Sequence, residues 1–180
     1  MPDHNSPYRL LSSRVVYDNG WLRLDEDTVI HPGGDKGRFG VITMKEGATV
    51  LPVTPAKQVY LAREYKYGLH RLSIEVMSGG LEEGESALVA AKREMREELG
   101  LTADLWTYLG YVDPFTTVIR ARNHMFLAQV LKETPTLDDP KEAVQRVAIP
   151  LAKAIDMVME GEITHSASCV VLLKAARILK

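Results

Sequence analysis

Three glutamates, Glu94, Glu97 and Glu98, are spaced so that an α-helix would place their carboxylates on one face. Residues three and four apart on a helix are surface neighbours, and like charges at that spacing repel one another. A hard divalent cation with oxygen ligands, such as Mg²⁺, would hold such carboxylates together. The alternative is a solvated acidic face, which is the ordinary explanation of an acidic cluster on a helix. The cluster alone therefore leaves both interpretations open.

The residues around the glutamates predict the helix that must position them. Ser86 precedes the first turn as an N-cap residue, and Gly100 follows the last apolar residue, where a helix can close on a left-handed residue. Apolar residues at spacings of three and four predict a stripe that faces the core. The stripe consists of Leu88, Ala91, Met95 and Leu99. We expect about four helical turns with one apolar side and one acidic side.

The spacing of the segment from Gly79 to Leu101 resembles the Nudix box, G-x5-E-x7-R-E-U-x-E-E-x-G-U, in which U is an aliphatic residue. Every fixed position of the motif is filled. These positions are Gly79, Glu85, Arg93, Glu94, Met95, Glu97, Glu98, Gly100 and Leu101. A match of this length in a loop-then-helix context is far more specific than a lone glycine-rich triplet. The resemblance implies hydrolysis of nucleoside diphosphates linked to a group X, with Mg²⁺ or Mn²⁺ as the cofactor.

The resemblance also implies roles for individual residues. The implied metal ligands are the backbone carbonyl of Ser78 and the carboxylates of Glu94, Glu97 and Glu98. Arg93 and Glu85 resemble the ion pair that orients the ligand helix. The implied catalytic residues are Glu97, Glu98, Arg93 and, as a general base, Glu142. Asp138 and Asp139 are the other acidic residues near Pro150, where the family often supplies carboxylates, so the identity of the base stays open.

Segments on both sides of the box resemble those of the ADP-ribose and ADP-sugar pyrophosphatases. They are VYLAREYKY at 59–67, SIEVMSGG at 73–80 and MEGEI at 159–163. The implied substrate is an ADP-sugar such as ADP-ribose, which would give AMP and a sugar phosphate. Arg63 is a candidate substrate contact because a guanidinium pairs with phosphate or stacks on a base, although an exposed strand arginine explains it equally well. Glu75 is a second candidate, because a carboxylate in an apolar strand needs a partner.

The sequence departs from this subgroup at residues 113–122, DPFTTVIRAR. The ADP-ribose enzymes commonly carry a Ser-Pro-Gly loop and a downstream glutamate there, and this chain keeps only the proline. Asp113 and Phe115 are candidate substrate contacts, and Phe115 either stacks on a base or packs locally. The departure leaves three other substrate classes open: another nucleotide sugar, a dinucleoside polyphosphate or a nucleoside triphosphate. A non-catalytic nucleotide-binding module is a further alternative, which the intact glutamates disfavour.

Composition fits a single enzyme-sized chain. With 180 residues, 46% of them hydrophobic, the chain can bury an ordinary core. The balance of 22 basic against 24 acidic residues argues against a nucleic-acid or membrane-binding surface. The only cysteine, Cys169, lies in an apolar run and is expected to be a small buried residue in a reducing compartment. Residues 1–13 lack the apolar region of a secretory signal, so we expect a cytoplasmic protein.

Strands and helices mix without a regular repeat, which favours an α+β fold. The resemblance specifies a Nudix-type α/β/α sandwich with a mixed sheet. We expect residues 1–44 to form an antiparallel β segment that mediates a homodimer, and residues 45–180 to form the catalytic domain. Within the latter we expect a hairpin of strands 50–53 and 58–64, and one strand, 73–77, leading into the box. Trp21 and Trp106 are expected in the core, and His124 is expected to be a hydrogen-bonded strand residue. A capping or surface role is expected of His165, at the start of the last helix.

Overall fold

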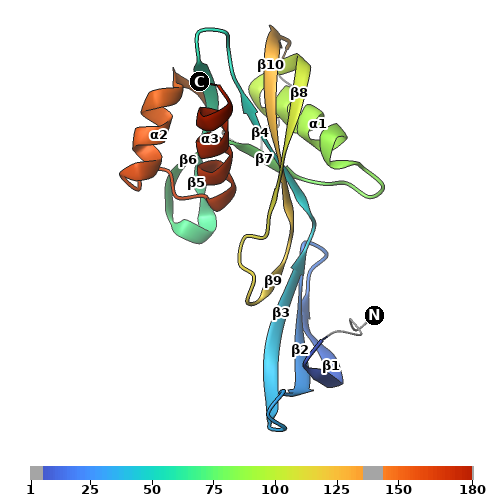
Figure 1. Cartoon of the computed structure of the whole chain (residues 1–180). Coiled ribbons are helices and arrows are strands. Elements are labelled where there is room, and N and C mark those ends of the chain that lie inside the picture. Colours follow the sequence, from blue (N-terminus) through green and yellow to red (C-terminus); the bar gives the residue numbers. More distant parts are fainter. Residues whose placement is uncertain (1–5, 136–143, 180) are drawn as a thin grey trace. The chain divides into compact units, whose positions relative to one another are not determined.

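The structure is a computed structural model that describes residues 6–135 and 144–179. The chain divides into two compact units (Figure 1). The first consists of residues 1–46 and 113–122, and the second of residues 47–112 and 123–180. The sequence did not predict that residues 113–122 join the first unit.

The first unit is a four-stranded sheet in the order β1-β2-β3-β9. Its strands are β1 Arg9–Asp18, β2 Leu22–Ile30, β3 Lys36–Met44 and β9 Ile119–Arg120. The first three strands are antiparallel, and the short β9 is parallel to β3. The turn between β1 and β2 contains Gly20 with a φ of +78°, a conformation that glycine adopts without steric cost. The expected amino-terminal antiparallel segment is therefore confirmed.

The outer strand of this sheet, β1, is exposed along its whole length. Trp21, in the turn that follows, is 61% exposed, so the expectation that it belongs to the core is wrong. The physical reason is that the first unit contains only strands among its described residues, and a sheet needs a second layer to bury its apolar face.

The second unit contains a mixed sheet in the order β7-β4-β10-β8. Its strands are β7 Met77–Gly80, β4 Gly47–Pro52, β10 Asn123–Glu133 and β8 Leu101–Val112. β4 and β10 are parallel, and the other pairs are antiparallel. A second, antiparallel sheet has the order β11-β5-β6, formed by β11 Gln145–Pro150, β5 Gln58–Lys66 and β6 Arg71–Glu75.

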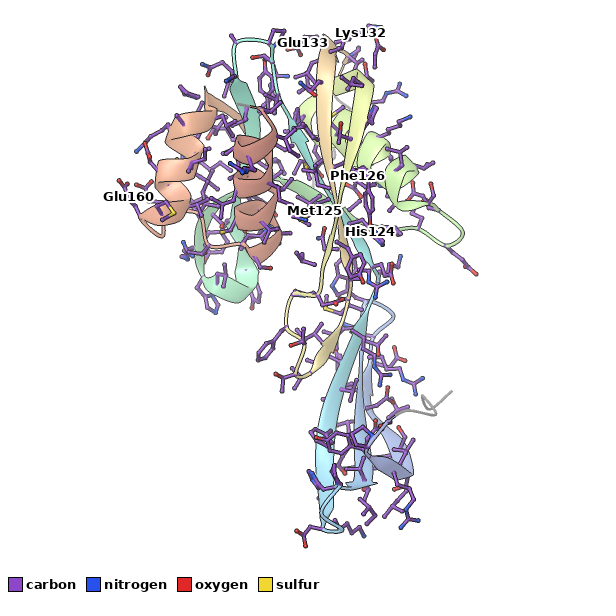
Figure 2. All side chains as sticks on the ribbon, in the orientation of Figure 1. His124, Met125, Phe126, Lys132, Glu133 and Glu160 are labelled. Carbon is purple, nitrogen blue, oxygen red and sulfur yellow. The ribbon has the colours of Figure 1, made fainter. Side chains whose placement is uncertain are left out.

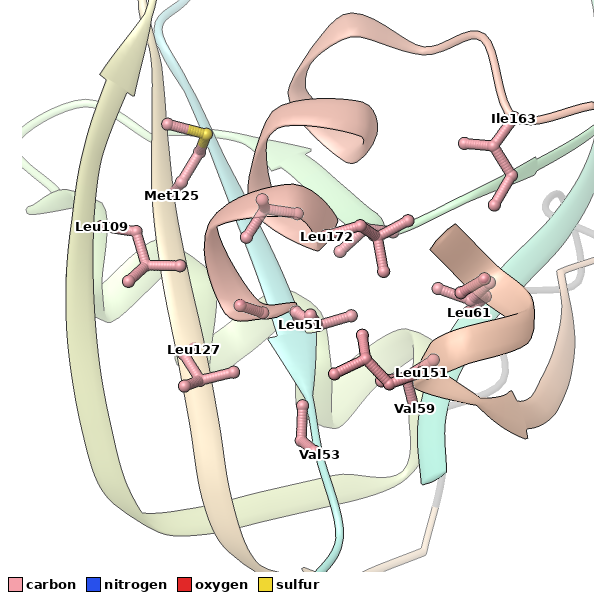
Figure 3. Packing of buried hydrophobic residues seen from close by; sticks show 14 of the residues in the cluster. Leu51, Val53, Val59, Leu61, Leu109, Met125, Leu127, Leu151, Ile163 and Leu172 are labelled. Carbon is pink, nitrogen blue, oxygen red and sulfur yellow. The ribbon is translucent and has the colours of Figure 1, made fainter. Parts of the chain in front are cut away.

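Helices pack on both faces of the mixed sheet. They are α1 Ala87–Leu99 and α3 Ser166–Ile178, whereas α2 Leu151–Met159 packs against α3 and against β11 and β5 of the second sheet. Side chains alternate along a strand, so neighbouring residues of β10 enter different cores. Phe126, labelled in Figure 2, belongs to the buried cluster that contains Met95 of α1, whereas Leu127 belongs to the cluster that contains Leu172 of α3 (Figure 3). The α/β/α sandwich expected from the sequence is confirmed. No helix of the described residues is long and apolar enough to cross a membrane.

Two expectations about strand pairing are wrong. β4 and β5 do not form a hairpin, because beyond the single bridge between Val53 and Val59 they enter different sheets. The strand expected at residues 73–77 is also two strands, since β6 ends at Glu75 in one sheet and β7 begins at Met77 in the other. The intervening Val76 is 1% exposed, and its N–H donates to the side chain of Ser168 instead of to a neighbouring strand.

The apolar stripe of α1 differs by one residue from the expected stripe. Leu88 is exposed, whereas Ala90 is completely buried beside Ala91 and Met95. A small side chain at position 90 allows the helix to approach the sheet closely, and Leu88 then lies at the margin of the contact. Trp106 is half-buried against the core under α1, and its Nε1–H donates to the carbonyl of Ala103 at 2.9 Å.

Candidate active site

The helix that carries the glutamates is capped at both ends. The Oγ of Ser86 accepts a hydrogen bond from the N–H of Val89, at 3.4 Å. Gly100 adopts a left-handed conformation with a φ of +60°, and its N–H donates to the carbonyls of Met95 and Arg96. Arg146 of β11 donates from Nη1 to the carbonyl of Leu99 at 2.9 Å. These bonds occupy backbone groups that a helix end leaves without intrahelical partners.

Arg93 connects the glutamates to the loop before the helix. Its Nε and Nη2 donate to the two carboxylate oxygens of Glu85, at 3.1 and 2.9 Å. Nη2 also donates to the carbonyl of Gly80 at 3.0 Å. Hydrogen bonds from Arg93 lower the pKa of Glu85, and the same pair is the main cause that raises the pKa of Arg93. The two residues therefore form the two-point ion pair that the box led us to expect, and it joins the loop to the helix.

The third nitrogen of Arg93 contacts two of the expected metal ligands. Nη1 lies 2.7 Å from Oε1 of Glu94 and 3.3 Å from Oε2 of Glu97. Two carboxylates from the same helix face thus converge on one cationic atom. The sequence predicted that a cation would be needed to hold these groups together, and it missed that Arg93 itself provides positive charge there.

Gly79 brings the end of β7 against the carboxyl group of Glu94. A Cβ atom at position 79 would overlap the Cδ and Oε1 atoms of Glu94. The motif requires glycine at this position because the Glu94 carboxylate packs directly against the backbone, and only a residue without a side chain leaves room for it. The neighbouring residue Ser78 pairs with Thr49 of β4.

The residues of this site fit a hard divalent cation. In the described ranges, 6–135 and 144–179, no three His, Cys, Asp or Glu side chains are gathered in a ready-made metal geometry. The fit rests instead on Glu94 and Glu97, whose carboxylates both contact Arg93 Nη1 and are therefore close enough to each other to share one cation. Carboxylate and carbonyl oxygens are the ligands that Mg²⁺ accepts.

Arg63 and Glu75, the first two expected substrate contacts, lie on the antiparallel sheet. Arg63 is exposed on β5, and its Nη1 lies 3.4 Å from Oε1 of Gln145. Glu75 is largely buried at the end of β6, with Oε2 3.6 Å from Nδ1 of His165 and 4.0 Å from Nζ of Lys66. The cation nearest to Glu75 is therefore Lys66, and His165 adds positive charge there only when it is protonated.

His165 is the N-cap residue of α3, but its side chain makes no capping hydrogen bond and is only partly exposed, so neither the expected capping role nor the expected surface role describes the side chain. Its Nδ1 lies 2.8 Å from Oγ of Ser168. Burial is the main cause that lowers the pKa of His165, with Lys66 acting in the same direction and Glu75 opposing it. His124, by contrast, is a hydrogen-bonded strand residue as expected, with Nδ1 3.0 Å from the hydroxyl of Tyr108.

Asp113 and Phe115, the other two expected substrate contacts, belong to the first unit. Asp113 lies 3.7 Å from Nε of Arg122. The Phe115 side chain is 55% exposed, while its backbone carbonyl accepts a hydrogen bond from the N–H of Ile119 at 3.0 Å. Glu142 and the alternative bases Asp138 and Asp139 lie outside the described residues.

Three polar residues beside the box strand were missed by sequence reasoning. Thr49 and Ser168 are completely buried, and Asn123 lies at the start of β10. Thr49 donates to Oδ1 of Asn123 at 2.8 Å, and its Oγ1 lies 2.6 Å from Oγ of Ser78. Hydroxyl residues are too common for their positions alone to be a signal, although Thr49 is the one hydroxyl residue in the apolar run 48–53.

A capped helix presents several glutamates beside a strand whose Gly79 leaves room for one of them, on an α/β/α sandwich, and this is the arrangement that the box of a pyrophosphate hydrolase requires. A family model described as NUDIX domain matches residues 44–167. The chain belongs to the Nudix family and is a Nudix pyrophosphohydrolase. A second model, described as nucleoside diphosphate sugar hydrolase N-terminal domain, matches residues 8–42.

Several characterised proteins resemble the chain over most of its length. An ADP-ribose pyrophosphatase of Bacillus subtilis is 26% identical over 165 residues, which cover 86% of this chain and 85% of that protein. A methanol dehydrogenase activator of Bacillus methanolicus is 23% identical, covering 88% of this chain and 86% of that protein. A crystal structure of an ADP compounds hydrolase shares the fold with a TM-score of 0.84 and 21% identity, covering 96% of this chain and 94% of that one.

Proposed function

We propose that this enzyme hydrolyses the pyrophosphate bond of a nucleoside diphosphate linked to a sugar, most specifically an ADP-sugar such as ADP-ribose. Water would add to one phosphorus atom while the bridging P–O bond breaks, giving AMP and a sugar phosphate. The observation that carries the proposal is the convergence of Glu94 and Glu97 on one cationic position beside Gly79. The similarity to an ADP-ribose pyrophosphatase and to the amino-terminal domain of nucleoside diphosphate sugar hydrolases supports the choice of substrate.

The proposed cofactor is Mg²⁺ or Mn²⁺. Its ligands would be the carboxylates of Glu94, Glu97 and Glu98 and the backbone carbonyl of Ser78. When bound, such a cation neutralises charge on the phosphates and makes an attacking water more acidic. Arg93 would hold the loop before α1 against the helix through its ion pair with Glu85, and a bound cation would take over the contacts that Glu94 and Glu97 make with Nη1 of Arg93.

The substrate would meet residues from several segments of the chain. We propose contacts with Arg63, Glu75, Asp113 and Phe115. The exposed guanidinium of Arg63, which also contacts Gln145, can face a phosphate, and the exposed ring of Phe115 offers a stacking surface. Glu142 stays a proposed catalytic residue, with Asp138 and Asp139 as the alternative bases, and the cytoplasmic location stays a prediction.

We also propose that the enzyme works as a homodimer through its first unit. All ten residues of β1 are exposed, and five of them are large apolar or aromatic residues: Leu10, Leu11, Val15, Val16 and Tyr17. An exposed apolar outer strand is a template for pairing with another chain. A two-fold dimer is the commonest closed arrangement that would cover it.

A hydrolysis screen tests the proposed reaction. ADP-ribose, other nucleotide sugars, dinucleoside polyphosphates and nucleoside triphosphates are each incubated with the enzyme and Mg²⁺ or Mn²⁺, and products are resolved by ion-exchange chromatography. We expect the highest kcat/KM with an ADP-sugar, and AMP as a product. Preference for a triphosphate or a dinucleoside polyphosphate would replace the proposed substrate class. Turnover of none of them with either metal would favour a nucleotide-binding module.

A further inference from the structure

A chain of hydrogen bonds surrounds the point where the polypeptide passes from one sheet to the other, immediately before the box. The N–H of Val76 is buried, and neither sheet supplies it with a strand partner. It donates to Oγ of Ser168 at 2.8 Å. Ser168 is itself completely buried on α3, 92 residues further along the chain.

The Ser168 hydroxyl is held from its other side by His165. Nδ1 of His165 lies 2.8 Å from the same Oγ atom. Because Oγ already accepts the Val76 N–H, its own hydrogen can be donated to Nδ1 of a neutral imidazole. Burial lowers the pKa of His165, which favours this neutral form.

A second buried hydroxyl, that of Thr49 on β4, contacts β7 at Ser78, two residues after Val76. Oγ of Ser78 lies 3.2 Å from the carbonyl of Val76 and 2.6 Å from Oγ1 of Thr49. Thr49, completely buried, donates in turn to Asn123. The peptide group ahead of β7 is therefore anchored through its N–H by α3, and the strand itself by β4.

We propose that Ser168 and Thr49 are positioning residues for the metal site of this enzyme, an inference that rests on the proposed function. They touch neither substrate nor cation. They fix the segment that ends in the Ser78 carbonyl and in Gly79, against which the Glu94 carboxylate packs. A shift of this segment would move the Ser78 carbonyl, one expected metal ligand. It would also move Gly79, which supports the carboxylate of Glu94, another expected ligand, whereas α1 and its caps would stay in place.

The test replaces each hydroxyl and measures Mn²⁺ binding directly. Ser168→Ala leaves the Val76 N–H buried without an acceptor, and Thr49→Val removes the other hydroxyl at nearly constant shape. Mn²⁺ is titrated into the purified enzyme without substrate and followed by electron paramagnetic resonance and calorimetry. We expect roughly tenfold weaker Mn²⁺ binding or more in each variant, as for residues that orient metal ligands. Ser166→Ala is the matched control, since Ser166 is exposed on the same helix and should leave binding unchanged.

Two further measurements separate positioning from stability. Thermal melting shows whether the variants are folded at the titration temperature, and Ser168→Thr, which keeps the hydroxyl, should restore part of the lost affinity. If folded Ser168→Ala and Thr49→Val bind Mn²⁺ as the unchanged enzyme does, the inference is overturned while the proposed function stands. If Ser168→Ala does not fold, the Thr49→Val result decides. If the unchanged enzyme binds no Mn²⁺, the proposed metal site fails and this inference fails with it.

Discussion

The carboxyl group of Glu94 occupies the space that any side chain at Gly79 would fill. The two residues belong to different elements, since Gly79 lies in β7 and Glu94 lies in the middle of α1. The glycine and the glutamate of the motif are thus required together, because the first leaves the space that the second fills. This packing places a carboxylate directly beside the backbone of the neighbouring strand.

This contact predicts that Gly79→Ala will move the Glu94 carboxylate out of place. We expect Mn²⁺ affinity and kcat to fall by roughly tenfold or more, the scale found when the support of a metal ligand is lost. Calorimetric Mn²⁺ titration and steady-state kinetics measure the two quantities. Gly68→Ala is the control, because an added Cβ there meets no atom within 4 Å. Normal metal binding in Gly79→Ala would contradict the proposed role of Glu94.

The carboxylate of Glu98 should be needed for turnover but not for folding. Glu98→Gln changes the charge and barely changes the shape, so we expect an unchanged circular dichroism spectrum and a kcat lower by roughly 100-fold or more, comparable to removing one group that stabilises the transition state. Glu83→Gln, at an exposed position in the loop before α1, is the matched control. Near-normal activity of Glu98→Gln would exclude Glu98 from the metal site.

The Arg93–Glu85 pair should stabilise the fold and the metal site together. Glu85→Gln removes a carboxylate whose side chain is 9% exposed, so we expect unfolding free energy to fall by about 1 to 2 kcal/mol, between the values for exposed and buried pairs. Urea denaturation measures this loss, and a Mn²⁺ titration should show weaker binding. Glu26→Gln, which breaks the exposed pair with Arg14, should change neither quantity. An unaltered melting temperature and metal affinity in Glu85→Gln would make the pair incidental.

His165 should make stability depend on pH in the mildly acidic range. Its pKa is lowered in the folded protein, so on acidification the unfolded chain takes up this proton first, near its ordinary pKa of about 6.5. Stability is therefore lost as pH falls from about 6.5 towards the lower folded pKa. Urea denaturation at a series of pH values should show a smaller loss for His165→Gln than for the unchanged enzyme. Equal slopes for the two proteins would contradict a depressed pKa at His165.

The exposed β1 strand predicts a dimer that charge can disrupt. Sedimentation equilibrium should give a mass of two chains for the full-length protein, and Val16→Lys should shift the distribution towards one chain. Ser13→Lys introduces the same charge at an exposed polar position of the same strand and should have less effect. Deletion of residues 1–40, followed by measurement of the mass in solution and of substrate affinity, shows whether this segment contributes to dimerisation, to substrate binding or to both. A full-length monomer that still turns over its substrate would rule the dimer out.

The sequence by itself determined the helix and the set of glutamates, because both depend on interactions over a few residues. Ser86 and Gly100 form the predicted caps, and the Arg93–Glu85 pair connects residues eight positions apart. The spacing of apolar residues correctly predicted the buried side of α1, except in its first turn. There, Ala90 is buried and Leu88 is exposed, because the contact of the helix with the sheet centres on the small residues Ala90 and Ala91.

Only the tertiary structure decided which segments meet. The separation of β4 from β5, and of β6 from β7, depends on hydrogen bonds to strands and side chains that are distant in sequence. Ser168 lies 92 residues from Val76, and no local pattern connects them. Trp21 is exposed because its sheet lacks a covering layer among the described residues, which the hydrophobicity of one residue cannot reveal. Local spacing determines which groups are available for chemistry, whereas long-range packing determines what holds them in place.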